Sequence, residues 1–394
     1  MPQIKPEVEA FARIKVIGVG GSGKNATNHM INSKVKGVEF IAVNTDAQDL
    51  HNSLASKKIH IGKNLTRGLG TGMNPELGKR AAEETKEEIQ EALKGSDMAF
   101  IAYGAGGGTG SGAGPIMSRV AKEMGILTVG VVTKPFFFEG IQRMKIAEQS
   151  LDELRKCVDA LIIIPNDRLL ATISRETTAK QAFSMCDDIL KQAVEGISDL
   201  ITMPGIINTD FADIRAVMEN AGSALMGIGT ASGENRAVEA ARAAISSPLL
   251  ELSIAGAKGV LFSIAGGDDL TMFEIQDAAK LITESIDPNA RVIFGTVHDD
   301  RLKKNELRIT VIASGFSDIS NKKSLFQNIV TNKEEDKKTK LFGGFGGAPT
   351  IEKEVKVETQ PTQVSVEEKK KIKNDFDDDS DWGAVPAFLR RQKK

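Results

Sequence analysis

The stretch from Gly104 to Gly114 constrains this chain most, because it places seven glycines among eleven residues between a strand pattern and a helix pattern. Turning a corner requires far fewer glycines, whereas backbone that closely surrounds a polyanion requires side chains to be absent. Thr109 and Ser111 can add hydroxyl donors, and Pro115 is predicted in the first turn of the following helix. The segment is therefore predicted to bind phosphate.

A second glycine-rich turn, Gly18–Gly23, follows the apolar run Ile14–Val19 and satisfies Gly-x-Gly-x-x-Gly. Extended to Asn25, it nearly matches the phosphate-loop pattern, but Asn25 replaces the hydroxyl residue that would bind magnesium. The turn alone therefore fits a dinucleotide site, a phosphate loop or a bare strand-to-helix turn. Two such loops in one chain favour a nucleotide-binding protein with a two-sided phosphate site.

Overall charge and composition exclude several classes of protein. The 394 residues include 51 basic and 53 acidic side chains, a net charge of −2, which argues against a dedicated nucleic-acid binder. Two cysteines, Cys157 and Cys186, offer neither a disulfide framework nor a zinc set and suggest a reducing compartment. No signal-peptide pattern and no apolar run of membrane-spanning length occurs. We expect a soluble, cytoplasmic protein with no direct membrane span and no metal site built from protein alone.

Short aliphatic runs alternate with helix patterns over the first 175 residues, which predicts a parallel α/β sheet with helices on both faces. The predicted strands are Ile14–Val19, Phe40–Val43, Met98–Tyr103, Leu127–Val132 and Ala160–Ile164. The predicted helices between them are Glu76–Leu93, Ala113–Met124 and Ile141–Cys157.

A helical stripe of about six turns runs from Thr178 to Ile201 and stops before Pro204. Helix patterns at 211–219 and 235–246 and strand patterns at 259–264, 291–296 and 306–313 predict a second, smaller α/β domain. From residue 333 onward 27 of 62 residues are charged, against 77 of 332 before it, which predicts a disordered tail. The predicted organisation is a flexible N-terminus 1–10, a nucleotide-binding domain 11–177, a central helix 178–203, a second domain 204–316, a linker 317–376 and a terminal peptide 377–394.

The combination of motifs resembles the tubulin/FtsZ family, and its FtsZ branch more than eukaryotic tubulin. The glycine loop 106–112 resembles the family signature, and further motifs match in order over about residues 10 to 316. These are 18–30, 44–46, 70–75, 133–136 with 139–140, 208–213 and 226–229.

The resemblance implies a polymerising GTPase that binds GTP or GDP with Mg²⁺, and a monovalent cation could assist hydrolysis. It implies that the phosphates, ribose and base are contacted by Gly20, Gly21, Ser22, Gly23, Lys24, Asn25, Asn44, Gly70, Gly72, Gly107, Gly108, Thr109, Gly110, Thr133, Pro135, Glu139, Arg143, Phe183 and Asp187. A carboxylate at Asp187 would favour guanine, which presents two donors, over adenine. An aromatic such as Phe183 on an amphipathic helix is otherwise usually a core residue.

The polar residues Asn208, Asp210 and Asp213 form the predicted catalytic set, since two acids can polarise a water molecule. Capping of the next helix by Asp210 is the alternative. The 18 residues from Asp187 to Gly205 span about 27 Å as a helix, beyond the reach of one nucleotide. These residues are therefore predicted to act on the nucleotide of a neighbouring subunit, in an open head-to-tail filament.

An apolar cluster near the C-terminus lies between an acidic run and a basic end, which is typical of a linear motif that folds on a partner. Its predicted contact residues are Trp382, Val385, Pro386, Phe388, Leu389, Arg390 and Arg391. The resemblance implies membrane-tethering and regulatory division proteins as partners, a filament ring at the division site and recruitment through this peptide.

Two alternatives remain at this stage. An NAD-dependent oxidoreductase could use the first loop with Asp46 or Glu39 on the ribose, but it gives the second glycine loop no role. A non-hydrolysing filament or filament regulator is the other, and the acids at 210 and 213 argue against it.

Overall fold

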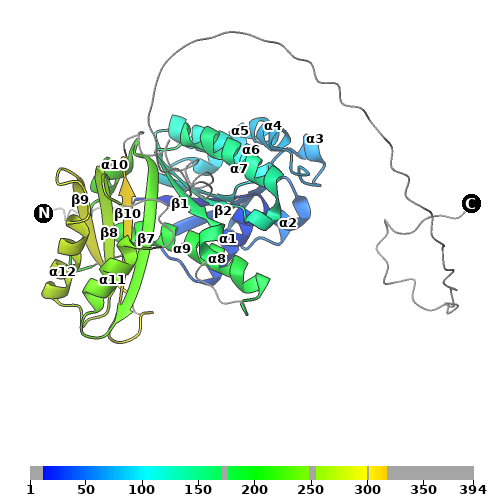
Figure 1. Cartoon of the computed structure of the whole chain (residues 1–394). Coiled ribbons are helices and arrows are strands. Elements are labelled where there is room, and N and C mark those ends of the chain that lie inside the picture. Colours follow the sequence, from blue (N-terminus) through cyan, green and yellow to red (C-terminus); the bar gives the residue numbers. More distant parts are fainter. Residues whose placement is uncertain (1–11, 171–175, 204, 248–253, 300, 317–394) are drawn as a thin grey trace, which may run out of the picture. The chain divides into compact units, whose positions relative to one another are not determined.

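The computed structural model describes residues 12–170, 176–203, 205–247, 254–299 and 301–316, and all of these belong to one compact unit, residues 1–332 (Figure 1). The predicted N-terminal segment 1–10, the linker 317–376 and the terminal peptide 377–394 lie outside the described residues.

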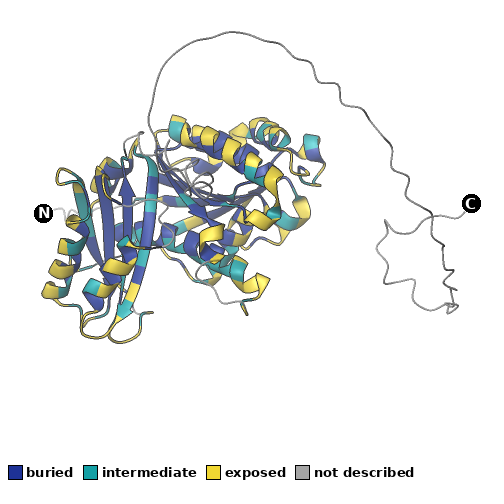
Figure 2. Cartoon of the chain, in the orientation of Figure 1, coloured by how far each residue is buried: buried dark blue, intermediate teal, exposed yellow. Residues whose placement is uncertain are grey.

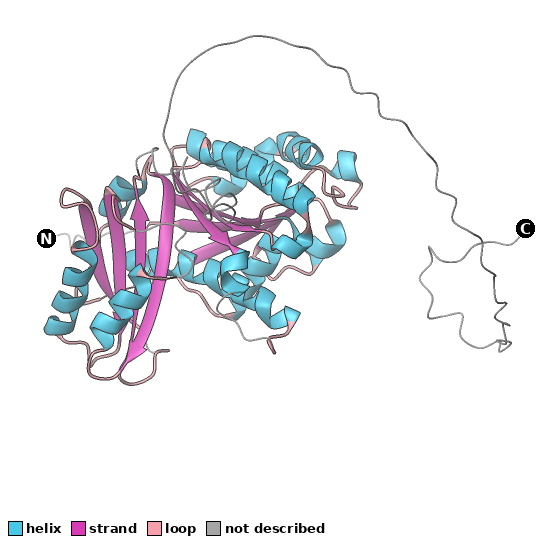
Figure 3. Cartoon of the chain, viewed as in Figure 1, coloured by secondary structure: helices cyan, strands magenta, loops and turns pink. Residues whose placement is uncertain are grey.

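A ten-stranded sheet forms the centre of this unit, in the order β3-β2-β1-β4-β5-β6-β7-β10-β8-β9. Figure 3 shows its strands in magenta, with helices beside them. Its first six strands are parallel. Their bounds are β1 Ile14–Val19, β2 Val38–Asn44, β3 Lys57–His60, β4 Met98–Gly104, β5 Leu127–Lys134 and β6 Ala160–Pro165. The predicted parallel sheet is confirmed, and β3 is a strand that the sequence patterns missed.

Helices cover both faces of the parallel strands, which are largely buried (Figure 2). Successive residues of a strand point to opposite faces, and in these strands the residues on both faces are apolar. Val16 packs in one core with α1 (Gly20–Asn32) and α9 (Ala179–Thr202). Ile17 packs in the other. That second core includes residues of α4 Pro75–Glu84, α5 Lys86–Leu93, α6 Gly108–Glu123 and α7 Ile141–Arg155.

The remaining strands extend the sheet. β7 (Gly222–Ser232) pairs in parallel with β6 over only three residues, and β10 (Glu306–Ser314) lies antiparallel between β7 and β8 (Gly259–Gly266). β9 (Arg291–His298) pairs in parallel with β8. These strands have a core of their own with α11 (Arg236–Ile245) and α12 (Met272–Thr283), so the smaller α/β unit is present but shares the first sheet.

The short helices are α2 Ala47–His51, α3 Lys63–Thr66, the 3-10 turn η1 Phe137–Glu139, α8 Asn166–Leu170 and α10 Phe211–Met218. The predicted long helix is α9, which begins at a capping box in which Thr178 accepts from the amide of Gln181.

Two predicted helices differ from the structure. The helix predicted over Glu76–Leu93 is two helices, because Thr85 takes φ −110° and ψ 20° between them. The helix predicted from Ala113 begins five residues earlier, at Gly108, so Pro115 lies inside α6 and not in its first turn. Helical glycines hid this start, because glycine is a poor helix former.

Candidate functional site

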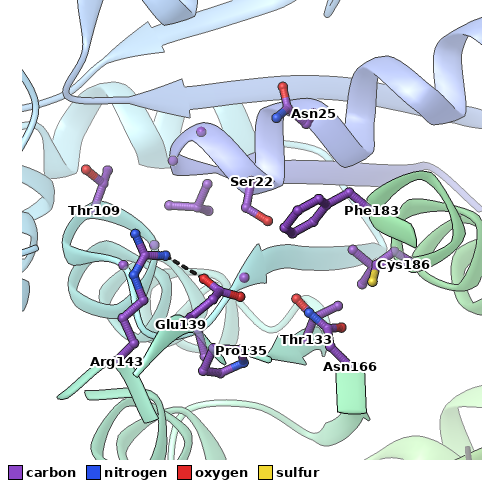
Figure 4. Close-up of a pocket in the computed structure, with 18 of the residues that line it drawn as sticks. Ser22, Asn25, Thr109, Thr133, Pro135, Glu139, Arg143, Asn166, Phe183 and Cys186 are labelled. Carbon is purple, nitrogen blue, oxygen red and sulfur yellow. Dashed lines mark hydrogen bonds and ion pairs between the residues drawn. The ribbon is translucent and has the colours of Figure 1, made fainter. Parts of the chain in front are cut away.

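A cavity of about 550 Å³ lies where β1, β4 and β5 end and α1, α6 and α9 pass (Figure 4). It collects side chains and backbone from segments that are far apart in the sequence. Its lining residues are Val19, Gly20, Gly21, Ser22, Asn25, Thr71, Gly104, Ala105, Gly107, Gly108, Thr109, Gly110, Thr133, Pro135, Glu139, Arg143, Asn166, Phe183, Cys186, Asp187 and Leu190. Both predicted glycine loops therefore face one space.

The N-termini of two long helices face this cavity. α1 begins at Gly20 and α6 at Gly108, and neither has a side-chain cap or an acidic residue in its first turn. The first amides of any helix lack intrahelical acceptors, and here no side chain caps them, while the helix dipoles add positive potential. Gly20 has φ +71°, and a Cβ there would lie 3.1 Å from the amide nitrogen of Gly110. Two adjacent helix ends of this kind suit adjacent phosphate groups.

Not every glycine of the second loop serves the cavity. Gly107 does line the cavity, and it borders open space, since a Cβ there would meet nothing within 4 Å. A Cβ on Gly112 would collide with the carbonyl oxygen of Pro75 in α4, and one on Gly114 would lie 2.5 Å from the ring of Tyr103. The interpretation of all seven glycines as a phosphate cradle is therefore wrong for Gly112 and Gly114, which allow α6 to pack closely on α4 and β4.

The two predicted hydroxyl residues of this loop have different surroundings. Thr109 lines the cavity, and its Oγ1 lies 2.7 Å from Oγ1 of Thr45 and 3.2 Å from Oγ1 of Thr71. Ser111 lies outside the cavity lining, and its Oγ accepts from the amide of Gly106 at 2.9 Å. Ser111 thus holds the loop, whereas Thr109 faces the space between the helices.

One wall of the cavity is formed by η1 and the start of α7. Nη1 of Arg143 in α7 lies 2.8 Å from Oε2 of Glu139 in η1, four residues earlier in the chain (Figure 4). The other oxygen of Glu139 accepts from the amide of Phe136 at 3.1 Å. Thr133 and Pro135, at the end of β5, complete this wall. The pair can offer hydrogen bonds to hydroxyl groups of a sugar.

α9 supplies Phe183, Cys186, Asp187 and Leu190 to one end of the cavity. Phe183 is 48% exposed and meets the buried ring of Phe136 edge-on, with centroids 5.4 Å apart, so it is not a core aromatic. Burial raises the pKa of Asp187 to about 6, although nearby His29 opposes this rise. Burial also raises the pKa of Cys186 to about 12, so its thiol is neutral. A flat ring and a carboxylate one turn apart can bind a planar base with hydrogen-bond donors.

Asn166, the first residue of α8, lines this end and was missed by the sequence interpretation. Its side chain is buried, at 6% exposure, and its Oδ1 has no hydrogen-bond partner. A buried polar atom without a partner is unusual and is expected to bind a ligand or water. Thr71 was missed as well, although its neighbours Gly70 and Gly72 were predicted. The position of Asn166 directly after β6, and that of Thr71 between the two predicted glycines, could have identified them from the sequence.

Five predicted nucleotide-binding residues lie outside the cavity lining. Gly23 packs against β4, since a Cβ there would collide with the carbonyl oxygen of Ala102. Nζ of Lys24 is 2.5 Å from Oδ1 of Asp49. The remaining three are Asn44, which donates to Asp49, and the positive-φ residues Gly70 and Gly72.

The predicted catalytic residues are all exposed and none of them lines the cavity. Asp210 is the N-cap of α10, since its Oδ1 accepts from the amide of Ala212 at 3.2 Å. Oδ1 of Asn208 accepts from the amide of Gly205 at 2.8 Å. Asp213 lies in the first turn of α10. In the single chain Asp210 therefore caps α10, as the alternative interpretation predicted.

Among the described residues, no three His, Cys, Asp or Glu side chains are grouped to bind a metal ion. Within the same residues, no helix has the length and apolar character needed to cross a membrane. The predicted partner-binding residues from Trp382 to Arg391 lie outside the described ranges.

Comparisons with known proteins agree with this geometry. Residues 13–174 match "Tubulin/FtsZ family, GTPase domain", and residues 222–317 match "FtsZ family, C-terminal domain". An empty FtsZ dimer from M. jannaschii is 44% identical, with a TM-score of 0.75 over 78% of this chain and 89% of that chain. A point mutant of that FtsZ gives the same identity and TM-score over 78% of this chain and 92% of that chain. CetZ2 from Haloferax volcanii, in a GTPγS-bound protofilament, is 22% identical, with a TM-score of 0.66 over 78% and 94% of the two chains. At that identity the match shows the fold alone.

Proposed function

Because this chain belongs to the FtsZ family of tubulin-like polymerising GTPases, we propose that it hydrolyses GTP in a composite site formed by two successive subunits of a head-to-tail filament. The family resemblance predicted from the motifs is confirmed. The oxidoreductase alternative is wrong, since the first glycine loop belongs to a GTPase domain. The observation that carries the proposal is the separation of the cavity from the exposed acids Asp210 and Asp213.

The cavity supports GTP as its ligand. The phosphates would lie against the paired N-termini of α1 and α6, and the ribose against Glu139 and Arg143. The base would stack on Phe183, with the Asp187 carboxylate accepting from N1–H and the amino group of guanine. The unpaired Oδ1 of Asn166 would accept from the second hydrogen of the guanine amino group. Adenine lacks that pair of donors, so guanine is favoured.

The length of α9 supports a site shared between subunits. Asp187 lies 15 residues before the end of α9 at Thr202, which corresponds to about 22 Å along the helix. A nucleotide bound at Asp187 would therefore leave Asp210 and Asp213 for the nucleotide of the adjacent subunit. A contact between opposite ends of identical subunits is heterologous and generates an open filament. The acids would orient or polarise the attacking water.

Exposed apolar residues support such contacts at both ends. Beside the cavity, Phe137, Phe138 and Ile141 are 80%, 67% and 80% exposed. At the other end Ile206, next to the predicted catalytic loop, is 68% exposed. Large exposed apolar side chains are typical of surfaces that another protein covers. Covering both groups by successive copies would also exclude water from the nucleotide.

Mg²⁺ is proposed to accompany the nucleotide. The described residues offer no group of three ligands for it, so phosphate oxygens and water would supply most of its coordination. A monovalent cation beside the predicted catalytic loop is part of the same proposal.

The cellular role is proposed by family. Filaments of this protein would form the cytokinetic ring in the bacterial cytoplasm. The terminal peptide 377–394 would recruit membrane-tethering and regulatory division proteins. Its apolar cluster between an acidic run and a basic end supports binding to a partner groove.

Three measurements test the proposal. The specific GTPase activity should rise with protein concentration and reach a plateau as filaments form, and Asp213→Ala subunits mixed into wild-type protein should lower the activity per wild-type subunit. Concentration-independent activity, or activity unaffected by the added variant, would contradict a shared site. Electron microscopy with GTP, GDP and no nucleotide should show filaments with GTP.

A further inference from the structure

Pro115 creates an exception in the hydrogen bonding of α6. Proline has no amide hydrogen, so it cannot donate to the carbonyl oxygen of Ser111, four residues earlier in the same helix. Ser111 is 4% exposed, and a buried carbonyl without a donor is costly. The Ser111 carbonyl therefore needs a donor other than the amide of residue 115.

Ser150 of α7 supplies this donor. Its Oγ lies 3.0 Å from the carbonyl oxygen of Ser111 and donates its one hydrogen to it. Its Oγ also lies 2.9 Å from the hydroxyl of Tyr103, which must then be the donor in that bond. Complete burial raises the pKa of Tyr103, so its phenol keeps the hydrogen. The result is a directed chain from β4 through α7 to α6.

The chain continues to the loop beside the cavity. Oγ of Ser111 accepts from the amide of Gly106 at 2.9 Å. Gly106 has φ +95°, and a Cβ on it would lie 2.8 Å from the carbonyl oxygen of Arg143. The loop is thus placed between α6 and the start of α7, directly before the cavity residue Gly107.

We propose that Ser150 is a positioning residue for nucleotide binding, which holds the second glycine loop in register with the α7 wall through Ser111. Ser150 follows the cavity residue Arg143 by seven residues, about two turns, so both lie on one face of α7. α7 therefore carries both Arg143, which lines the cavity, and Ser150, which contacts the glycine loop through Ser111. This inference rests on the proposed nucleotide site and adds a residue that does not line it.

The test uses Ser150→Thr and Ser150→Val, which have nearly the same shape and differ in the hydroxyl. Each is made in the wild-type chain and in Pro115→Ala, where the amide of residue 115 can donate to the Ser111 carbonyl. The dissociation constant for GDP is measured on full-length protein below the concentration at which it assembles. Ser118→Ala is the control, because Oγ of this buried serine bonds the Gly114 carbonyl on the same helix.

In the wild-type background we expect Ser150→Val to weaken GDP binding about fivefold to tenfold relative to Ser150→Thr, as for one lost buried hydrogen bond. In the Pro115→Ala background the two variants should differ by less than about twofold, because the carbonyl has a helical donor. Ser118→Ala should lower thermal stability without changing GDP affinity.

Equal affinities of the Thr and Val variants in the wild-type chain would overturn the proposal. An equal loss from Ser150→Val in both backgrounds would also overturn it, because the Ser111 carbonyl would then not carry the effect. Wild-type protein that fails to bind GDP would overturn the nucleotide site itself, which distinguishes the two failures.

Discussion

Nζ of Lys24 lies 2.5 Å from Oδ1 of Asp49, and the lysine side chain is 9% exposed. Oδ2 of the same carboxylate accepts from Nδ2 of Asn44 at 2.8 Å. The cation of the first glycine loop therefore connects α1 to α2 and β2, and backbone amides face the cavity in its place.

Replacing Lys24 by Met should lower stability more than nucleotide affinity. The change leaves Asp49 without its cation, and we expect the free energy of unfolding to fall by about 1–2 kcal/mol, since the Asp49 side chain is 30% exposed. GDP affinity should change less than about threefold. Denaturant unfolding and GDP titration measure the two quantities. A large loss of affinity at unchanged stability would instead assign Lys24 to the phosphates.

Alanine at Gly107 and at Gly112 should separate binding from folding. Gly107 has φ −87° and open space around its Cβ position, so Gly107→Ala should keep the thermal midpoint while its methyl group enters the cavity and weakens GDP binding about tenfold or more. Gly112→Ala forces α6 away from Pro75 and should cost about 2 kcal/mol or more. Thermal unfolding with GDP titration tests both. The opposite pattern would show that the two glycines have been assigned the wrong roles.

Asp187 should make both stability and binding depend on pH. Its pKa of about 6 in the empty protein lies above its ordinary value of 3.8, so its contribution to folding stability is fully present below about pH 4 and is lost as pH rises through 6. Guanine needs the ionised carboxylate, so GDP affinity should rise between pH 5 and 7.

Calorimetric titrations over that range measure this change in affinity. Asp187→Asn should remove the pH dependence and shift preference from guanine to xanthine nucleotides, because an amide can donate to the xanthine C2 carbonyl. A pH-independent affinity of wild-type protein would contradict ionisation of Asp187 on binding.

Asp210 should separate capping from catalysis when Asn and Ala are compared. Asn is as good an N-cap as Asp, so Asp210→Asn should keep the stability of α10, whereas Asp210→Ala should lose about 1 kcal/mol. Both should bind GTP and lose about 10²-fold in turnover if the charge acts on water. Phosphate release from assembled protein measures turnover. Full activity of Asp210→Asn would leave this residue with the capping role alone.

Local sequence patterns were sufficient for much of the fold. The period of the apolar residues over Thr178–Ile201 predicted α9 nearly to the residue, because one face of this helix is buried from Cys186 to Leu200 and Phe183 of the same stripe lines the cavity. Short apolar runs predicted five parallel strands, since such strands are buried on both faces. Irregular or short elements such as β3 and α8 carry no such period.

The sequence by itself determined the two glycine loops, most of the strands and the family, because each depends on residues close together in the chain. It missed β3, β7 and α12. Only the tertiary structure decided which glycines serve phosphate and which serve packing, since Gly112 meets Pro75 across 37 positions. It also decided the pairing of Lys24 with Asp49, the unpaired buried oxygen of Asn166 and the donor that Ser150 supplies to α6. A periodic pattern tells which face of an element is buried, but the element that covers this face is chosen by the packing of the whole chain.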